Sequence, residues 1–250
     1  MKKLVVANWK MNPQSLAEAT DILNFCDEYL RGRSQTFEGQ IIFCPPFIFI
    51  EEIGKWLQTS ALLKYSTLGS QDISSGSEGA WTGEVSGPML KRLGVEYVII
   101  GHSERRWKMG ETDEIVNQKI KIALANDIVP IVCLGEKDRD KSFQEFLKDQ
   151  TIKSFAGIAA DQVSKCIIAY EPVWAISTNP ESKPDNPENA LESISVIQGA
   201  LGVPARMYLY GGSITSINAQ DFLSKENIDG VLVGGASVKK EEFVKILATI

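Results

Sequence analysis

Short apolar runs recur eight times along the chain, and most of them are continuous rather than alternating. Continuous apolar runs of strand length are typical of parallel strands that are buried on both faces. The runs are Leu4–Ala7, Gln40–Cys44, a weaker one at Tyr65–Leu68, Tyr97–Ile100, Ile128–Cys133, Cys166–Tyr170, Arg206–Tyr210 and Gly230–Val233.

Segments with helical spacing separate these runs. Ser15 is suited to cap a helix whose apolar positions form one stripe between Leu16 and Leu30. Further helical segments are expected at Lys91–Leu93, Asp113–Leu124, Phe143–Phe155, Asn189–Leu201, Ala219–Leu223 and Lys240–Leu247.

The alternation of strand and helix predicts one α/β domain, a single (β/α)₈ barrel over residues 1–250. No linker rich in Pro, Gly and Ser divides the chain, and 250 residues suit one barrel. A doubly wound open sheet is the alternative. Its dinucleotide-binding form is disfavoured, because no G-x-G-x-x-G sequence opens a helix after the first run.

Composition restricts the partners and the location. The chain carries 26 Lys and Arg against 32 Asp and Glu, a net charge of −6, which argues against nucleic acid or an anionic membrane as partner. No apolar stretch is long enough to span a membrane, and the first run stops at Asn8, too soon for a secretory signal. The 4 cysteines are widely spaced without a C-x-x-C pair, which favours a reducing, cytoplasmic location.

Polar groups and glycines follow most of the predicted strands. In a barrel the carboxyl ends of all strands meet at one rim, where active sites are built. The barrel therefore predicts that a lysine, a histidine, several carboxylates and two Gly-Gly turns converge there. The segments are Asn8-Trp9-Lys10, Pro45-Pro46, Gln71-Asp72, Gly101–Arg106, Gly135-Glu136, Glu171-Pro172, Gly211-Gly212-Ser213 and Gly234–Ser237.

Glu171 and His102 are candidate functional residues. Pro172 holds Glu171 extended at the end of a buried strand, although a surface carboxylate would have the same local sequence. His102 is the only histidine, and a lone histidine is more often structural. Its place after a strand, beside Ser103 and Glu104, favours a functional role over a structural one.

Other chemistry at His102 is disfavoured. A single histidine excludes a multi-histidine metal site, and no Asp, Glu or Cys spacing suits a metal. A relay from Ser103 to His102 would need adjacent side chains to point the same way, and no G-x-S-x-G elbow is present.

Positive charge and glycine turns indicate an anionic substrate. Lys10 at the end of the first strand would point into the barrel mouth, with Glu104 as a partner that holds it in place. Arg105 is open to two interpretations, a solvated charge or part of a subunit contact. Gly-Gly turns after the seventh and eighth strands are typical of phosphate binding by backbone N–H groups. No nucleotide-binding loop of Walker type is present, so a small phosphorylated metabolite is expected.

In this order and spacing, the motifs resemble those of the triosephosphate isomerase family over essentially the whole chain. The matching pieces are Asn8-Trp9-Lys10, Gln71-Asp72, Gly79–Glu84, Ile100–Arg106, Cys133–Glu136, Ala169–Ile176, Tyr210–Ser213 and Leu232–Ser237.

The resemblance implies the activity and the role of each site residue. Glu171 would be the base that interconverts dihydroxyacetone phosphate and D-glyceraldehyde 3-phosphate through an enediol(ate), and neutral His102 would shuttle protons between the two oxygens. Lys10 and Asn8 would stabilise the negative oxygen, with Glu104 and Ser103 in support. No cofactor or metal is implied. The backbone N–H groups that would hold the phosphate belong to Ser177, Ser213, Gly234 and Gly235.

The resemblance also implies a lid over about residues 172–187, and there the sequence departs from the family. The usual Ile-Gly-Thr-Gly-Lys is here Ile176-Ser177-Thr178-Asn179-Pro180, so two glycines are absent, and three prolines have entered the segment. The alternative is therefore a catalytically weakened relative that acts as a binding or scaffold protein. Another phosphate-binding barrel, such as an aldolase, would need a Schiff-base lysine or metal ligands that are absent here.

The resemblance further implies a homodimer. The segment Gln71–Glu84 has the full length of the family loop that reaches into a partner subunit, with Thr82 at its tip and Glu84 and Arg105 as further contacts. An ordinary long surface loop is the other interpretation.

Overall fold

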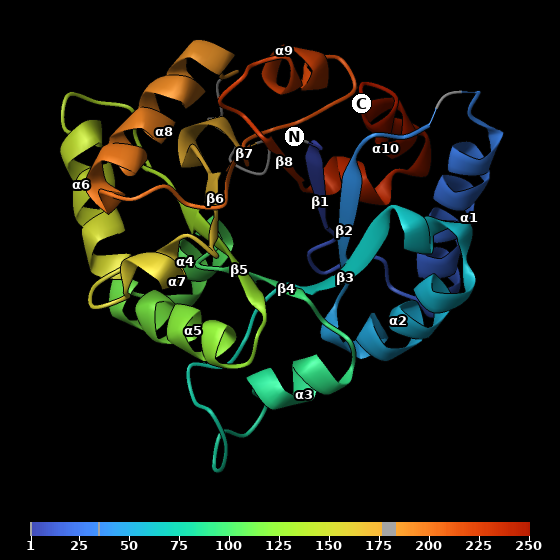
Figure 1. Ribbon diagram of the computed structural model, residues 1–250, viewed down its shortest axis with the longest axis horizontal. Coiled ribbons are helices and arrows are strands. Elements are labelled where there is room, and N and C mark those ends of the chain that lie inside the picture. Colours follow the sequence, from blue (N-terminus) through green and yellow to red (C-terminus); the bar gives the residue numbers. More distant parts are fainter. Residues whose placement is uncertain (1, 35, 177–183) are drawn as a thin grey trace.

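A closed barrel of eight parallel strands forms the centre of the computed structural model, which describes residues 2–34, 36–176 and 184–250 (Figure 1). Each strand pairs with its neighbours in the sequence, and the eighth pairs with the first. The strands are β1 Leu4–Asn8, β2 Gln40–Cys44, β3 Ser66–Ser70, β4 Tyr97–Ile100, β5 Val129–Leu134, β6 Ile167–Tyr170, β7 Met207–Tyr210 and β8 Gly230–Val233.

Helices surround the barrel and cover the outer faces of its strands (Figure 1). They are α1 Leu16–Gly32, α2 Ile50–Thr59, α3 Gly87–Arg92, α4 Ser103–Met109, α5 Asp113–Ala125, α6 Phe143–Ser154, α7 Ala160–Val163, α8 Pro187–Leu201, α9 Ala219–Leu223 and α10 Lys240–Leu247, with short 3₁₀ turns η1 Phe47–Phe49, η2 Ala61–Lys64, η3 Val173–Ala175 and η4 Gly235–Val238.

The strands are continuous apolar runs because both of their faces are covered. Leu4 and Val6 of β1 pack with residues of the other strands in one cluster inside the barrel. The alternate residues Val5 and Ala7 belong to a second cluster, which includes Leu23 of α1. Burial on both sides removes the polar alternation that a half-exposed strand would show.

The predicted strands are confirmed, with ends displaced by a few residues at most. Ser15 caps α1 as expected, since its side chain accepts a hydrogen bond from the N–H of Glu18. Helix α2 was not predicted, although Ile50, Ile53 and Leu57 lie on one helical face and are buried. Its apolar pattern covers only a few residues and directly follows the aromatic segment Phe47–Phe49, which obscures the start of the helix.

Charged groups are also buried beneath the loop that follows β3. The Lys119 ammonium of α5 lies 2.7 Å from Asp72 Oδ1 and also binds Glu111. Arg105 Nη2 is 2.8 Å from Asp72 Oδ2. Burial raises the pKa of Asp72, while the charges of Lys119 and Arg105 act against that rise. This cluster, Asp72, Arg105, Glu111 and Lys119, anchors the base of the loop.

Among the described residues, no helix combines the length and the apolar character that a membrane crossing would require. All 4 cysteines are buried and free of disulfide bonds.

Candidate active site

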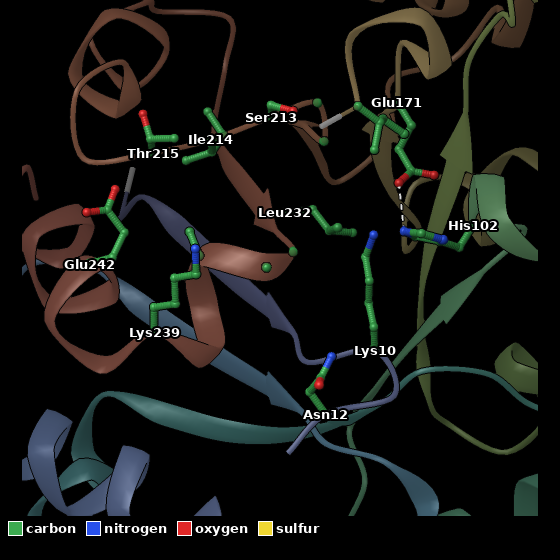
Figure 2. Close-up of a pocket in the computed structure, with 16 residues that line it drawn as sticks. Lys10, Asn12, His102, Glu171, Ser213, Ile214, Thr215, Leu232, Lys239 and Glu242 are labelled. Atoms are coloured by element: carbon green, nitrogen blue, oxygen red, sulfur yellow. Dashed lines mark ion pairs between the residues drawn. The ribbon is translucent and has the colours of Figure 1, made fainter. Parts of the chain in front are cut away.

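A cavity of about 510 Å³ opens at the carboxyl rim of the barrel (Figure 2). Side chains or backbone from the segments after β1, β4, β6, β7 and β8 line it, so residues far apart in the sequence share one space. Lys10, His102 and Glu171 point into the same part of the cavity. The convergence expected from the barrel is therefore present.

Glu171 follows the last residue of β6 and is only 2% exposed. Its Oε1 lies 2.9 Å from His102 Nε2. Its Oε2 accepts a hydrogen bond of 2.9 Å from the backbone N–H of Ser103, the first residue of α4. Ser103 thus contacts the Glu171 carboxylate through its backbone N–H.

The environment of Glu171 favours the carboxylate form. Burial alone would raise the pKa of Glu171, but His102, the Ser103 N–H and the charge of Lys10 outweigh it and lower the pKa. A carboxyl group with a lowered pKa is ionised at neutral pH. Glu171 is therefore ready to accept a proton.

His102 is held as one neutral tautomer. It caps the N-terminus of α4, where its Nδ1 accepts a hydrogen bond of 3.2 Å from the backbone N–H of Glu104. A ring nitrogen that accepts cannot carry a proton, so the proton lies on Nε2 and is donated to Glu171. The imidazole faces the cavity as an uncharged N–H donor.

Lys10 occupies a conformation that is rare outside glycine, with φ +53°. Asn8 Oδ1 accepts a hydrogen bond of 3.0 Å from its N–H, and Gln71 Nε2 donates one of 2.8 Å to its carbonyl. The ammonium lies 3.1 Å from Glu104 Oε1, the partner expected from the sequence. Backbone and side chain are thus both fixed, with the charge directed at the cavity.

The glycine turns lie against the catalytic side chains. A Cβ atom on Gly211 would be 2.9 Å from Glu171 Cγ, and one on Gly234 would be 3.1 Å from Lys10 Cε. Both contacts are closer than ordinary van der Waals distance, so glycine gives the backbone room to approach there. Ser213 and Gly235 line the same wall of the cavity.

Only the two ends of the lid lie in the described part of the chain. Residues 177–183 are outside it, including the expected phosphate ligand Ser177. At the first end, Trp174 Nε1 donates to Glu136 Oε1 at 2.9 Å, and Ser213 Oγ donates to the carbonyl of Ala175 at 2.8 Å. At the second end, Asn186 caps α8 and Pro187 begins it.

The expected dimer contacts lie apart from the cavity. The loop Gln71–Glu84 projects away from the barrel beside α3 (Figure 1), and its residues Thr82 and Glu84 are exposed. Arg105 binds Asp72 and Glu111 rather than substrate-facing groups.

Sequence reasoning gave no role to two residues that position the site. Gln71 holds both the Lys10 carbonyl and, at 2.9 Å, that of Cys44. Glu136 accepts from Trp174 and, at 2.8 Å, from the hydroxyl of Tyr170. The only indication in the sequence of a role for Gln71 and Glu136 is that they follow β3 and β5 at the carboxyl rim. Their partners depend on loop conformation, which spacing alone does not fix.

Across residues 2–34, 36–176 and 184–250, no group of three or more His, Cys, Asp or Glu side chains is arranged to hold a metal ion.

An ionised carboxylate paired with a neutral imidazole is suited to moving protons on and off carbon and oxygen. Fold and site together therefore define the class, a (β/α)₈-barrel enzyme with proton-transfer chemistry at its carboxyl rim.

Comparison with known proteins narrows this class. The family described as "Triosephosphate isomerase" matches residues 3–250. Proteins named triosephosphate isomerase from Dehalococcoides mccartyi, Endomicrobium trichonymphae and Alkaliphilus oremlandii are 41%, 39% and 38% identical to this chain, each over 98% of it. The matches cover 96%, 98% and 98% of those proteins. The chain belongs to the triosephosphate isomerase family.

Proposed function

We propose that this protein interconverts dihydroxyacetone phosphate and D-glyceraldehyde 3-phosphate through an enediol(ate), without a cofactor. The observation that carries the proposal is the contact of 2.9 Å between His102 Nε2 and Glu171 Oε1, in a cavity shared with Lys10 and the glycine turns. Membership of the family supports the same reaction.

The proton moves in two stages. Glu171 removes a proton from the carbon next to the carbonyl and later returns it to the neighbouring carbon. The neutral N–H of His102 donates to the forming oxygen anion and recovers a proton from the other oxygen, so both groups end as they began. Lys10, with Asn8 in support, stabilises the negative oxygen in the intermediate.

The phosphate is held by backbone N–H groups of Ser213, Gly234 and Gly235, which we call the phosphate cradle. Ser177 is proposed as a fourth donor. Backbone donors next to glycine can approach a phosphate closely, because no Cβ intervenes. The ammonium of Lys10 adds charge complementarity to the dianionic substrate.

The lid is proposed to close over the intermediate with contacts that differ from those of its relatives. The altered sequence after Ile176 is the basis for expecting different contacts, and the bond from Ser213 Oγ to the Ala175 carbonyl joins the start of the lid to the cradle. Replacing residues 177–183 with a glycine-containing family sequence should change turnover or the affinity for a substrate analogue. Unchanged kinetics would contradict a special lid.

An isomerisation assay tests the proposal. Wild-type protein should convert glyceraldehyde 3-phosphate, followed by a coupled NADH reaction, and Glu171→Gln should lower kcat by about 10²–10⁴-fold, the usual worth of a positioned base. A wild-type protein as inactive as Glu171→Gln would favour the alternative, a weakened relative that acts as a scaffold.

A homodimer that forms through the Gln71–Glu84 loop is also proposed. Trp81 near the loop tip is 52% exposed and Met89 on the adjacent α3 is 56% exposed, and large apolar side chains of this kind favour a protein contact. A cytoplasmic location is proposed with it, supported by the 4 free, buried thiols.

A further inference from the structure

The proposed phosphate cradle is built from two separate loops. Ser213 belongs to the loop after β7, while Gly234 and Gly235 belong to the turn after β8. One phosphate can be held by both only if the gap between the loops is constant. Gly234 directly follows the last residue of β8, whereas Ser213 lies beyond the end of β7 and is separated from it by Gly211 and Gly212, so the sheet alone does not fix the position of Ser213.

Each loop has its own internal brace. Ser237 is fully buried, and its N–H and Oγ donate to the Gly234 carbonyl at 2.8 and 2.7 Å. In the other loop, Asn218 Nδ2 donates to the Ser213 carbonyl at 2.9 Å, and Asn218 Oδ1 accepts from the Thr215 N–H at 2.8 Å. Each brace fixes one half of the cradle without fixing the distance between them.

The side chain of Glu242 joins the two halves. Glu242 lies in the first turn of α10, the helix that follows the turn after β8. Its Oε1 accepts from the Ser216 N–H at 2.6 Å and its Oε2 accepts from Ser216 Oγ at 3.0 Å. Ser216 lies between Thr215 and Asn218. The Glu242 carboxylate therefore binds the same turn that Asn218 connects to Ser213.

A carboxylate at this position needs an explanation. Glu242 lines the cavity that is proposed to bind a dianion, where negative charge would repel the ligand (Figure 2). The Ser216 N–H lowers the pKa of Glu242, which keeps it ionised. Both oxygens are directed at Ser216, so the group is placed to hold the loop.

We propose that Glu242 is a positioning residue which, through Ser216 and Asn218, sets the distance between the two halves of the phosphate cradle. The inference rests on the proposed function and extends it. Glu242 itself does not touch the reacting atoms. Its removal should weaken recognition of the phosphate group and leave the Glu171–His102 pair in place.

Two substitutions at Glu242 separate the effect of its hydrogen bonds to Ser216 from the effect of its charge. In Glu242→Gln the amide oxygen can still accept from the Ser216 N–H, and the amide NH₂ can donate to Ser216 Oγ, so both hydrogen bonds survive. Glu242→Ala removes both. Glu241→Ala is the matched control, because Glu241 is an exposed carboxylate in the same helical turn.

The measurement compares glyceraldehyde 3-phosphate with glyceraldehyde, which lacks the phosphate. Glu242→Ala should lower kcat/KM for the phosphorylated substrate about tenfold, the scale of two lost hydrogen bonds that position a ligand. It should leave the slow reaction of glyceraldehyde unchanged. The inhibition constant of inorganic phosphate should rise by a similar factor. Glu241→Ala should behave like wild type. Glu242→Gln should show no loss of phosphate affinity, because it keeps both hydrogen bonds and removes a negative charge from the cavity.

Three results would overturn the inference: wild-type kinetics in Glu242→Ala, an equal loss with glyceraldehyde, or the same loss in Glu242→Gln as in Glu242→Ala.

A thermal-unfolding measurement checks that Glu242→Ala folds. If it does not, Ser216→Ala, which removes one of the two hydrogen bonds, is expected to show a smaller loss of kcat/KM for the phosphorylated substrate. Wild-type behaviour of Ser216→Ala would also contradict the inference. If wild-type protein has no isomerase activity, the proposed function fails on its own. Calorimetric binding of inorganic phosphate to the same variants then decides the role of Glu242.

Discussion

At the scale of single residues, Lys10 shows how much structure is needed to place one charge. Its backbone takes a left-handed conformation, which costs a non-glycine residue of the order of 1–3 kcal/mol. Hydrogen bonds from Gln71 and to Asn8 offset this cost. The ammonium is thereby fixed before substrate arrives, which avoids paying for its ordering during binding.

Removing this charge should affect catalysis specifically. Lys10→Met is expected to lower kcat/KM for glyceraldehyde 3-phosphate by about 10²–10³-fold, the loss typical of one electrostatic donor to a transition state. Lys108→Met is the control, because Lys108 Nζ is also near Glu104 Oε1, at 4.0 Å, but is exposed. A comparable loss in both variants would show that Lys10 acts only through Glu104.

The buried thiols give a prediction about pH. Burial raises the pKa of Cys26 and Cys166 to about 12, from an ordinary value of 9.0. Between these values the unfolded chain releases protons that the folded protein keeps. Stability from each thiol is therefore complete below about pH 9 and falls above it by about 1.4 kcal/mol per pH unit, until the folded thiol also ionises near pH 12.

Two measurements check this prediction. Native protein at about pH 8.5 should resist alkylation by iodoacetamide at all four cysteines, while protein in denaturant should react at each. Urea unfolding should show a steeper alkaline decline in wild type than in Cys166→Ala. Rapid labelling of native protein would mean that a thiol is accessible.

The residues also show what the sequence could reveal. Lys10, His102 and Glu171 were expected to share one space because the strand ends of a barrel meet at one rim, and they line one cavity. Gln71, Glu136 and Glu242 were not given roles, because hydrogen bonds between loops depend on exact conformations. Ser103 was expected to support the site, and the structure shows a hydrogen bond from its backbone N–H to Glu171 Oε2, which the sequence does not indicate.

At the scale of elements, strands were easier to predict than helices. Burial on both faces leaves a continuous apolar run whatever the neighbours are, so every strand was visible. Helix α2 is short and was missed despite its buried stripe, and the seven residues of α4 were read only as a site motif. Short helices gain most of their stability from packing, which the local pattern does not record.

The buried cluster at the base of the 71–84 loop gives a prediction at this scale. Lys119→Met should lower the free energy of unfolding by about 3–5 kcal/mol, because Asp72 and Glu111 would lose a buried partner. Lys121→Met, an exposed position on the same helix, should change it by less than about 0.5 kcal/mol.

A second variant identifies the cause. Adding Asp72→Asn to Lys119→Met removes one of the two carboxylates that share Arg105 once Lys119 is gone, and leaves Glu111 with Arg105. Part of the lost stability should return in urea unfolding. No recovery would indicate that the loss comes from packing of the lysine stem rather than from charge.

At the scale of the whole molecule, the projecting loop predicts association. Wild-type protein should have twice the chain mass of 27.6 kDa in light scattering at micromolar concentration. Thr82→Arg should favour the monomer, because a charge at the loop tip would have to be buried in the partner. Ile152→Arg, on the outer face of α6 and 49% exposed, should remain a dimer. A monomeric wild type would contradict the proposal.

The closed ring of strands divides the site between the two halves of the chain. Residues up to the α5–β5 turn at Asn126 supply Lys10 and His102, and residues from Asp127 onwards supply Glu171 and the cradle. A polypeptide cut at that turn would yield two fragments that are each inert. Isomerase activity would return only when the two fragments reassociate. The protein could then serve as a split reporter, in which enzyme activity measures how much of the two fragments has come together.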